Sequence, residues 1–361
     1  MHTTPDEAGT NLTTMVALQI SLGKMDGGGR RVAAFRRALD DLGAVRLVAV
    51  GPDGDAANDR ALRSPIHRAK RRLLPVPLRG PVARRLTNQP CVGPTVSLIP
   101  SAHHWSLQRG PTWLDFADLW SGIARNHART VDLISASFNR VHARTWAKRE
   151  ATEARSADVA SVASWADRDR LACDAVWLPT PVTDRFNTDR RTGASDVRTC
   201  GMIANFDYPP NRDAYRRLVA EWLPVLTPTF ERVIVAGFGS DALPRSPHID
   251  ILGPISSVES FYHNVDAVLA PMERGGGMKV KVVEAMMHGV PVIATEHSID
   301  GLPPAISAAC IQLNGPWQLG WDPRDDASIA DELHHFTFDA FLAQFRSVWF
   351  DKMVGDSAQR L

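Results

Sequence analysis

Short apolar runs alternate with amphipathic segments along most of this chain, and many of the runs end at glycine, proline or a polar turn. Met15–Ile20 and Val45–Val50 are two such runs, and between them Arg30–Leu42 carries apolar residues at helical spacing. Parallel strands need a connection of a dozen or more residues, which is usually a helix. The alternation therefore predicts an α/β fold with doubly wound parallel sheets.

The alternation continues through both halves of the chain. In the N-terminal half, further strands are expected at Pro94–Ile99, Thr112–Phe116, Leu133–Ser135, Val159–Ser161 and Ala175–Leu178. In the C-terminal half, strands are expected at Thr199–Ile203, Arg232–Ala236, Ile249–Leu252, Asp266–Ala270, Pro291–Thr295 and Ala309–Leu313. The expected helices of that half are Asn211–Leu226, Ser256–Asn264, Met278–His288 and one amphipathic helix over Ala327–Lys352.

The length of 361 residues suggests two domains. We place the boundary in the polar, turn-rich stretch Pro179–Ser195. The expected domains are residues 1–182 and 183–335, and a helix in residues 336–361 is expected to cross back to the first domain. Two doubly wound domains that face each other leave a central cleft between the carboxyl edges of their sheets, where ligands usually bind.

The composition excludes several classes of protein. The chain has 41 Lys and Arg against 40 Asp and Glu, so it lacks the positive charge typical of nucleic-acid binding. Its four cysteines are widely spaced and form no metal-binding pattern, so we expect no metal site. The N-terminus is polar, and no apolar run approaches the roughly 18–20 residues needed to span a bilayer. These features indicate a cytoplasmic protein.

The segment Asp266–Thr295 carries the strongest signal for chemistry. An apolar strand ends at Pro271, three glycines follow, and a helix comes next. Glycines let the backbone approach a ligand closely, and the amide groups of a first helical turn are unpaired donors. Lys279 and Lys281 near that turn oppose the helix dipole by about 0.3–1 kcal/mol each, unless an anion occupies the site. Glu284, one turn further on, is well placed to accept hydrogen bonds from ribose hydroxyls.

These residues resemble a known family. From Gly275 the sequence reads Gly-Gly-Gly-x-Lys-x-Lys-x-x-Glu-Ala-Met-x-x-Gly-x-Pro-Val-x-Ala-Thr, which resembles the donor-site signature of the retaining "group 1" glycosyltransferases of GT-B fold. Gly201–Ala214 is similar to the opening of that family's donor domain, and Val235–Gly239 to its glycine-ended strand. The positions of Gly253, Tyr262 and Asp266 also fit. The resemblance is thinner in the N-terminal half.

The resemblance implies a metal-independent hexosyl transfer, with retention, from a nucleotide-diphosphate sugar to a hydroxyl group, without a tightly bound cofactor. By family analogy Glu284 would hold the ribose, and Lys279 or Lys281 would neutralise the departing diphosphate together with the amides of Gly276–Met278. The expected donor contacts are Gly28, Gly29, Gly237, Gly253, Ile255, Glu273, Gly275, Gly276, Gly277, Met278 and Glu284. Gly253 and Ile255 would lie beside the base, and Gly28 and Gly29 would approach the phosphates from the other domain.

One position departs from the family pattern. Many members carry a second glutamate eight residues before the ribose-binding one, and Gly276 occupies that position here. Glu273 lies three residues earlier, and only the loop could bring it to the sugar. The role of that glutamate is not carried over, so the identity of the sugar stays open.

Candidates for the acceptor side come from the N-terminal half. A GT-B site usually takes a His or an Asp from the N-terminal sheet, close to the sugar and the incoming hydroxyl. Asp118, after the strand Thr112–Phe116, is the first candidate, and Asp115 is the second. His103 and His104 follow the strand Pro94–Ile99 and are further candidates.

The stretch His67–Arg85 holds seven Lys and Arg and no acid, with leucines and valines between them. Mixtures of basic and apolar residues bind anionic membrane surfaces. The stretch therefore predicts a peripheral contact with the inner face of a membrane. The acceptor stays open among a glycoconjugate, a polysaccharide, a lipid-linked compound and a small molecule.

Two alternatives stay open beside the transferase. A nucleotide-sugar epimerase on the same fold is one, because a fold alone does not define a function. A non-catalytic relative that binds a nucleotide-sugar is the other, and Gly276 in place of the usual acid motivates it.

Overall fold

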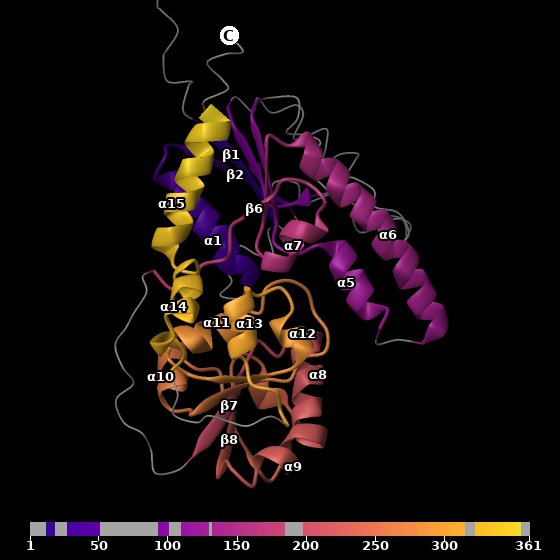
Figure 1. Cartoon of the computed structure of the whole chain (residues 1–361), viewed down its shortest axis with the longest axis vertical. Coiled ribbons are helices and arrows are strands. Elements are labelled where there is room, and N and C mark those ends of the chain that lie inside the picture. Colours follow the sequence, from indigo (N-terminus) through magenta and orange to yellow (C-terminus); the bar gives the residue numbers. More distant parts are fainter. Residues whose placement is uncertain are drawn as a thin grey trace, which may run out of the picture. The chain divides into compact units, whose positions relative to one another are not determined.

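The computed structural model of the chain describes residues 12–18, 27–50, 93–100, 110–129, 132–184, 198–314 and 322–354 (Figure 1). The chain divides into two compact units. Unit 1 comprises residues 1–180 and 341–361, and unit 2 comprises residues 181–340. Each unit has its own parallel sheet, in agreement with the predicted α/β class.

The sheet of unit 1 has the strand order β2-β1-β3-β4-β5-β6, and its paired strands are parallel. Its strands are β1 (Thr13–Leu18), β2 (Val45–Val50), β3 (Thr95–Ser97), β4 (Thr112–Phe116), β5 (Val159–Val162) and β6 (Val176–Trp177). The direction of winding reverses between β1 and β3, the point at which doubly wound sheets bind ligands. Helix α1 (Gly27–Asp40) follows β1 and starts at the first of three glycines, three residues before the expected start at Arg30.

A buried ion pair ties α1 to the sheet. The guanidinium of Arg31 donates to both carboxylate oxygens of Asp115, at 2.6 Å and 2.5 Å. It also donates to the carbonyl oxygen of Leu178 at 2.8 Å. The hydroxyl of Ser161 donates to Asp115 at 2.6 Å and accepts from the indole of Trp113. A buried ion pair is tolerated only when further hydrogen bonds complete it, and these bonds join α1, β4, β5 and the end of β6.

The C-terminal residues complete the core of unit 1. Phe35 of α1 makes edge-to-face contacts with Trp113, Phe341 and Phe345, at centroid distances of 6.1, 5.4 and 5.9 Å. Trp113 and Phe345 stack at 4.8 Å. Phe341 and Phe345 belong to α15 (Phe338–Val348), and every ring in this cluster is buried.

Unit 1 also contains a pair of packed helices, α5 (Trp120–His127) and α6 (Leu133–Ser156), which we call the α5–α6 hairpin. Helix α5 packs against the long helix α6, and Figure 1 shows the two side by side. The buried carboxylate of Glu150 in α6 accepts from the backbone N–H of Ser121 in α5 at 3.1 Å. Burial raises the pKa of Glu150 to about 7, and the charge of Asp167 in α7 (Trp165–Arg170) adds to the increase.

The sheet of unit 2 has the strand order β11-β10-β7-β8-β9, again with parallel pairs. Its strands are β7 (Thr199–Ile203), β8 (Arg232–Ala236), β9 (Ile249–Gly253), β10 (Ala267–Ala270) and β11 (Val292–Ala294). Its helices include α8 (Pro209–Arg217), α9 (Leu223–Leu226), α10 (Val258–His263), α11 (Val280–Met287), α12 (Glu296–Ile299), α13 (Pro304–Ala309) and α14 (Ala327–His334). The winding reverses between β7 and β10.

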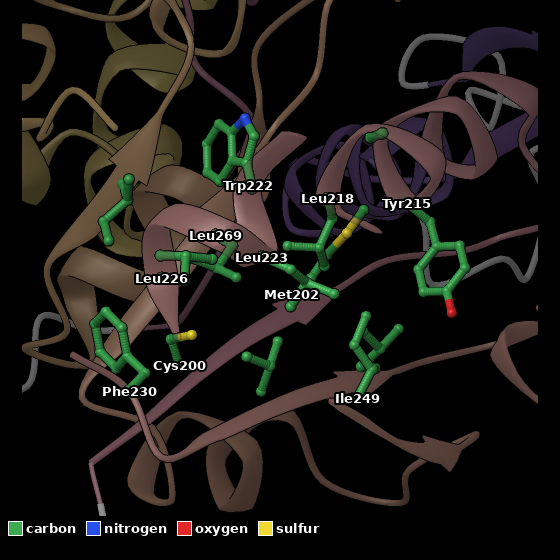
Figure 2. Close-up of a cluster of buried hydrophobic side chains, with 14 of the residues drawn as sticks. Cys200, Met202, Tyr215, Leu218, Trp222, Leu223, Leu226, Phe230, Ile249 and Leu269 are labelled. Atoms are coloured by element: carbon green, nitrogen blue, oxygen red, sulfur yellow. The ribbon is translucent and has the colours of Figure 1, made fainter. Parts of the chain in front are cut away.

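One face of this sheet packs against the helical stretch from α8 to α9. Figure 2 shows Leu218, Trp222 and Leu226 of that stretch lying over Met202 of β7 and Leu269 of β10. Residues 218–222, between α8 and α9, are π-helical. Pro224, two residues after this stretch, has no N–H to continue the regular hydrogen-bond pattern, which accounts for the wider turn. The resulting cluster anchors the strands whose carboxyl ends carry the candidate site.

Three sequence-based expectations are wrong. Leu133–Ser135 is not a strand but the first turn of α6, because the Asp132 carboxylate caps the helix by accepting from the backbone N–H groups of Ile134 and Ser135. Ala309–Leu313 contributes only a single bridge, between Ile311 and Ile293. Ala327–Lys352 is two helices, α14 and α15, because residues 335–337 are not helical and Thr337 forms a bridge with Thr183.

The raised pKa of Glu150 predicts a pH dependence of stability. Between pH 4.5 and pH 7 the folded protein keeps a proton that the unfolded chain has lost. The contribution of Glu150 to the free energy of unfolding should therefore be largest below pH 4.5 and fall by about 2–3 kcal/mol as the pH rises to 7. Glu150→Gln keeps an acceptor for Ser121 without a charge. We expect it to raise the thermal midpoint at pH 8 and to leave it unchanged at pH 4. An equal effect at both pH values would contradict the assignment.

Candidate functional site

The carboxyl edge of the unit 2 sheet is built from glycines with positive φ. Gly237 follows β8 with φ 119°, and Gly253 ends β9 with φ 75°. A Cβ atom on Gly237 would lie 2.1 Å from the carbonyl oxygen of Ala204, so only glycine fits there. A Cβ atom on Gly253 would meet no atom within 4 Å. The edge is therefore tightly packed at Gly237 and open at Gly253.

A glycine loop, residues 273–278, connects β10 to α11 beside the point where the winding reverses. Lys279 is the N-cap residue of α11 and is buried. Its ammonium group donates to the carbonyl oxygens of Gly276 and Gly277, at 3.1 Å and 2.8 Å. Helix α11 begins at Val280, two residues later than expected, so Lys281 lies in the first turn and Lys279 holds the loop.

Lys281 reaches across to α8. Its ammonium group donates to the side-chain oxygen of Asn211 at 3.1 Å, and the amide nitrogen of Asn211 donates to the carbonyl oxygen of Asn205 at 2.7 Å. Burial, together with the nearby charge of Lys279, lowers the pKa of Lys281 to about 8. A cation held by a neutral amide keeps its positive charge available to an anionic ligand.

Two ion pairs fasten the start of the glycine loop to α8. Glu273, which is half exposed, pairs with Arg217, and Arg274 pairs with Asp213. The carboxylate of Glu273 is therefore engaged with a helix of its own unit. Motifs about 60 residues apart in the sequence come together here, because α8 follows β7 and the loop follows β10, and these two strands are neighbours.

Glu284 is buried in α11, and Tyr262 of α10 positions it. The Tyr262 hydroxyl donates to Oε2 of Glu284 at 2.9 Å. The Tyr262 ring stacks on the imidazole of His288 at a centroid distance of 4.8 Å. Burial lowers the pKa of His288, although the charge of Glu284 opposes the shift. The hydrogen bond from Tyr262 of α10 therefore orients the Glu284 carboxylate.

His297 is a site residue that the sequence did not indicate. It lies in α12, whose N-cap Thr295 donates through its hydroxyl to the carbonyl oxygen of Met272, next to the glycine loop. Burial and the charge of Lys279 lower the pKa of His297 to about 4, against the effect of hydrogen bonds with the backbone of Gly275 and Arg274. Its Nε2 is buried and has no hydrogen-bond partner in the described part of the chain. Sequence periodicity could not have identified His297, because the glycine loop with which it interacts lies about 20 positions earlier in the chain.

Ile255 borders a hollow of about 580 Å³ at the edge of the sheet. The hollow lies between β8, the end of β9 and the start of α10. Its lining includes Ile234, Leu252 and Phe261, together with the polar residues Ser256, Ser260 and Asn264. Ile255 therefore lies at a mixed apolar and polar surface next to Gly253.

Unit 1 places the acceptor-side candidates in different surroundings. Asp118 is partly exposed in the bend between β4 and α5, and the N-cap of α5 is the next residue, Leu119. Asp115 is buried in its ion pair with Arg31 and is not available to a ligand. Gly28 is exposed and Gly29 is buried in the first turn of α1.

His103, His104 and the basic segment 67–85 lie outside the described residues. Within the described ranges, no group of three or more His, Cys, Asp and Glu side chains could hold a metal ion. The helices of those ranges include none that is long and apolar enough to span a membrane.

Comparison with known proteins gives the family of unit 2. Residues 197–336 match the family described as glycosyl transferases group 1. They form a group 1 glycosyltransferase domain. The matched region contains both the glycine loop and α8, so the residues assembled around Lys281 all belong to this domain. A search of curated protein sequences finds no match.

Solved glycosyltransferase structures share the fold over nearly the whole chain. A glycosyltransferase from Rickettsia africae is similar at a TM-score of 0.58 and 13% identity, over 94% of this chain and 98% of that chain. Alr3699/HepE from Anabaena, in complex with UDP and glucose, is similar at a TM-score of 0.55 and 12% identity, over 94% and 99% of the two chains. The fold is GT-B, with two Rossmann-like units.

The two lysines should have opposite effects on stability. Burial of a charged Lys281 disfavours folding at neutral pH, because its pKa is below the ordinary value of 10.5. Lys281→Met should raise the free energy of unfolding at pH 7 by about 1–2 kcal/mol. Lys279→Met should lower it by about 1–2 kcal/mol, because two loop carbonyls lose their donor. Thermal midpoints at pH 7 measure both changes, and midpoints that move in the same direction would refute the difference between the two lysines.

Proposed function

We propose that the protein transfers a hexosyl group from a nucleotide-diphosphate sugar to an acceptor hydroxyl, with retention and without a metal ion. The observation that carries the proposal is Lys281, a partly buried cation with a lowered pKa, hydrogen-bonded to Asn211 beside the glycine loop of a group 1 glycosyltransferase domain. Such a cation is costly for the empty protein, and a bound diphosphate would offset that cost.

The nucleoside would bind along α11 and the end of β9. In this proposal the Glu284 carboxylate accepts hydrogen bonds from the ribose hydroxyls, and Tyr262 keeps it in the required orientation. The base would lie against Gly253 and Ile255. The open space at the Cβ position of Gly253 and the adjacent apolar side chains support this placement.

The diphosphate would bind at the glycine loop. Lys281 would supply the positive charge, and the backbone N–H groups of Gly275–Met278 would supply oriented donors. Lys279 would keep the loop in its binding conformation through its bonds to Gly276 and Gly277. His297 is neutral at pH 7 and has a buried free nitrogen, so it is proposed to hydrogen-bond a phosphate or a sugar hydroxyl.

Breaking the glycosidic bond leaves negative charge on the departing diphosphate. A fixed cation and oriented amides stabilise that charge without a metal ion, which is the main catalytic contribution available to these residues. On the acceptor side, Gly28 and Gly29 are proposed to approach the phosphates. Asp118, with His103 or His104, is proposed to act near the incoming hydroxyl.

Uridine diphosphate is the first nucleotide to test, because Alr3699/HepE from Anabaena is described in complex with UDP and with UDP and glucose. Glu284→Gln should weaken UDP binding about tenfold, because ribose hydroxyls donate more strongly to a charged acceptor. Isothermal titration calorimetry measures the affinity. Glu259→Ala, an exposed change on α10, is the matched control and should bind as the wild type does. Equal affinity for both variants would disprove the ribose contact.

The pKa of Lys281 also predicts a pH dependence of nucleotide binding. Only the protonated amine attracts a diphosphate, so the affinity should fall as the pH rises through about 8. The dissociation constant should be about tenfold higher at pH 9 than at pH 7. Lys281→Arg keeps its charge over this range and should lose less affinity. Titrations at both pH values test this, and parallel behaviour of wild type and variant would exclude Lys281 from the phosphate site.

A further inference from the structure

The α5–α6 hairpin of unit 1 exposes large apolar side chains to solvent. Leu133 and Ile134 at the start of α6 are 82% and 85% exposed, and Phe138 and Val141 are also exposed. Trp120 at the start of α5 is exposed as well and stacks on Trp146 of α6. Several large apolar side chains exposed on one helical hairpin usually mark an interaction site.

The exposed residues are not the packing face of α6. Ile134, Phe138 and Val141 are spaced by four and three residues, so they form one stripe over two turns of the helix. The opposite side of α6 carries Ala136, Ala143 and Glu150, which are buried, and Glu150 bonds to α5. The helix is therefore fixed in the unit by one side and presents the stripe on the other.

The charge around the stripe is strongly positive. Residues 120–149 contain six Lys and Arg and a single acid, Asp132, although the whole chain is balanced at 41 to 40, and one of the six, Arg149, pairs with Glu153 further along α6. Arg140, Arg144 and Lys148 are exposed on α6 along the line next to the stripe. Asp132 is engaged as the N-cap of α6.

We propose that the α5–α6 surface, defined by the stripe, Trp120 and the three adjacent basic residues, docks on an anionic lipid bilayer. Apolar side chains would enter the boundary between headgroups and acyl chains, while the long basic side chains reach the anionic headgroups. Trp120 suits the same interface, because tryptophan is enriched where one end of a side chain is apolar and the other is wet. A symmetric contact between two copies is disfavoured, because it would bring the same basic residues against each other.

The full chain can be tested by co-sedimentation with phosphatidylcholine vesicles that contain about 30% phosphatidylglycerol, and with pure phosphatidylcholine vesicles. The wild type should bind the anionic vesicles and lose that binding between about 0.1 and 0.5 M salt. Ile134→Gln with Phe138→Gln should lower the partition coefficient about tenfold, and Arg140→Gln with Arg144→Gln should lower it by a similar factor.

Matched controls carry the same changes elsewhere. Phe350→Gln removes an apolar residue of similar exposure in unit 1, and Arg198→Gln with Arg245→Gln removes two exposed charges of unit 2. Both control variants should bind vesicles as the wild type does. All variants should keep the wild-type thermal midpoint, because every changed side chain is exposed.

Three results would overturn the proposal. The first is a wild type that does not prefer anionic vesicles. The second is binding that survives in both hairpin variants, which would place the contact elsewhere, as in segment 67–85. The third is a wild-type dimer, seen by light scattering, that the Ile134→Gln and Phe138→Gln pair dissociates without any vesicle binding.

Discussion

The hydrogen bond between Lys281 and Asn211 is the contact around which the site of unit 2 is organised. It joins the first turn of α11 to α8, and the ion pairs of Asp213 and Arg217 join the same helix to the start of the glycine loop. The helical stretch from α8 to Trp222 also packs on the sheet. The glycine loop is therefore connected through α8 to the hydrophobic core. The arrangement keeps a positive charge in a place where burial disfavours it, which is typical of a site whose ligand supplies the opposite charge.

Unit 1 is held together by a buried pair of opposite charges. Arg31 and Asp115 neutralise each other inside the unit, and their remaining hydrogen-bonding groups are met by Leu178, Thr180 and Ser161. This pair positions α1, which contains the phosphate candidates Gly28 and Gly29, and β4, which the acceptor-side candidate Asp118 follows in the chain. Arg31 and Lys281 thus differ in partner: a carboxylate neutralises Arg31, whereas an amide oxygen leaves Lys281 with a net charge.

The central strands could be predicted because strands of a parallel sheet are buried on both faces and appear as short apolar runs. Thr112–Phe116, Thr199–Ile203 and Arg232–Ala236 have the expected bounds. The same criterion failed at Leu133–Ser135, where the apolar side chains are exposed on a helix, and at Ala309–Leu313, where only Ile311 pairs with the sheet. An apolar run shows that a segment avoids water, but it does not show what covers the segment. In α6 the fold leaves the apolar side chains of such a run exposed, and the membrane proposal is based on this exposure.

The sequence by itself determined the α/β class, the glycine loop between β10 and α11 and the resemblance to group 1 glycosyltransferases, because these depend on local pattern and on residues close together in the chain. Tertiary structure decided the environment of each charge. Lys279 and Lys281 are two residues apart and look alike in sequence, yet one bonds to the loop carbonyls and the other to Asn211, 70 residues away. His297 and Tyr262 likewise gain their places only when α12 lies beside the glycine loop and α10 beside α11. A pKa or a hydrogen-bond partner depends on which distant groups share the same space, and only the folded chain brings those groups together.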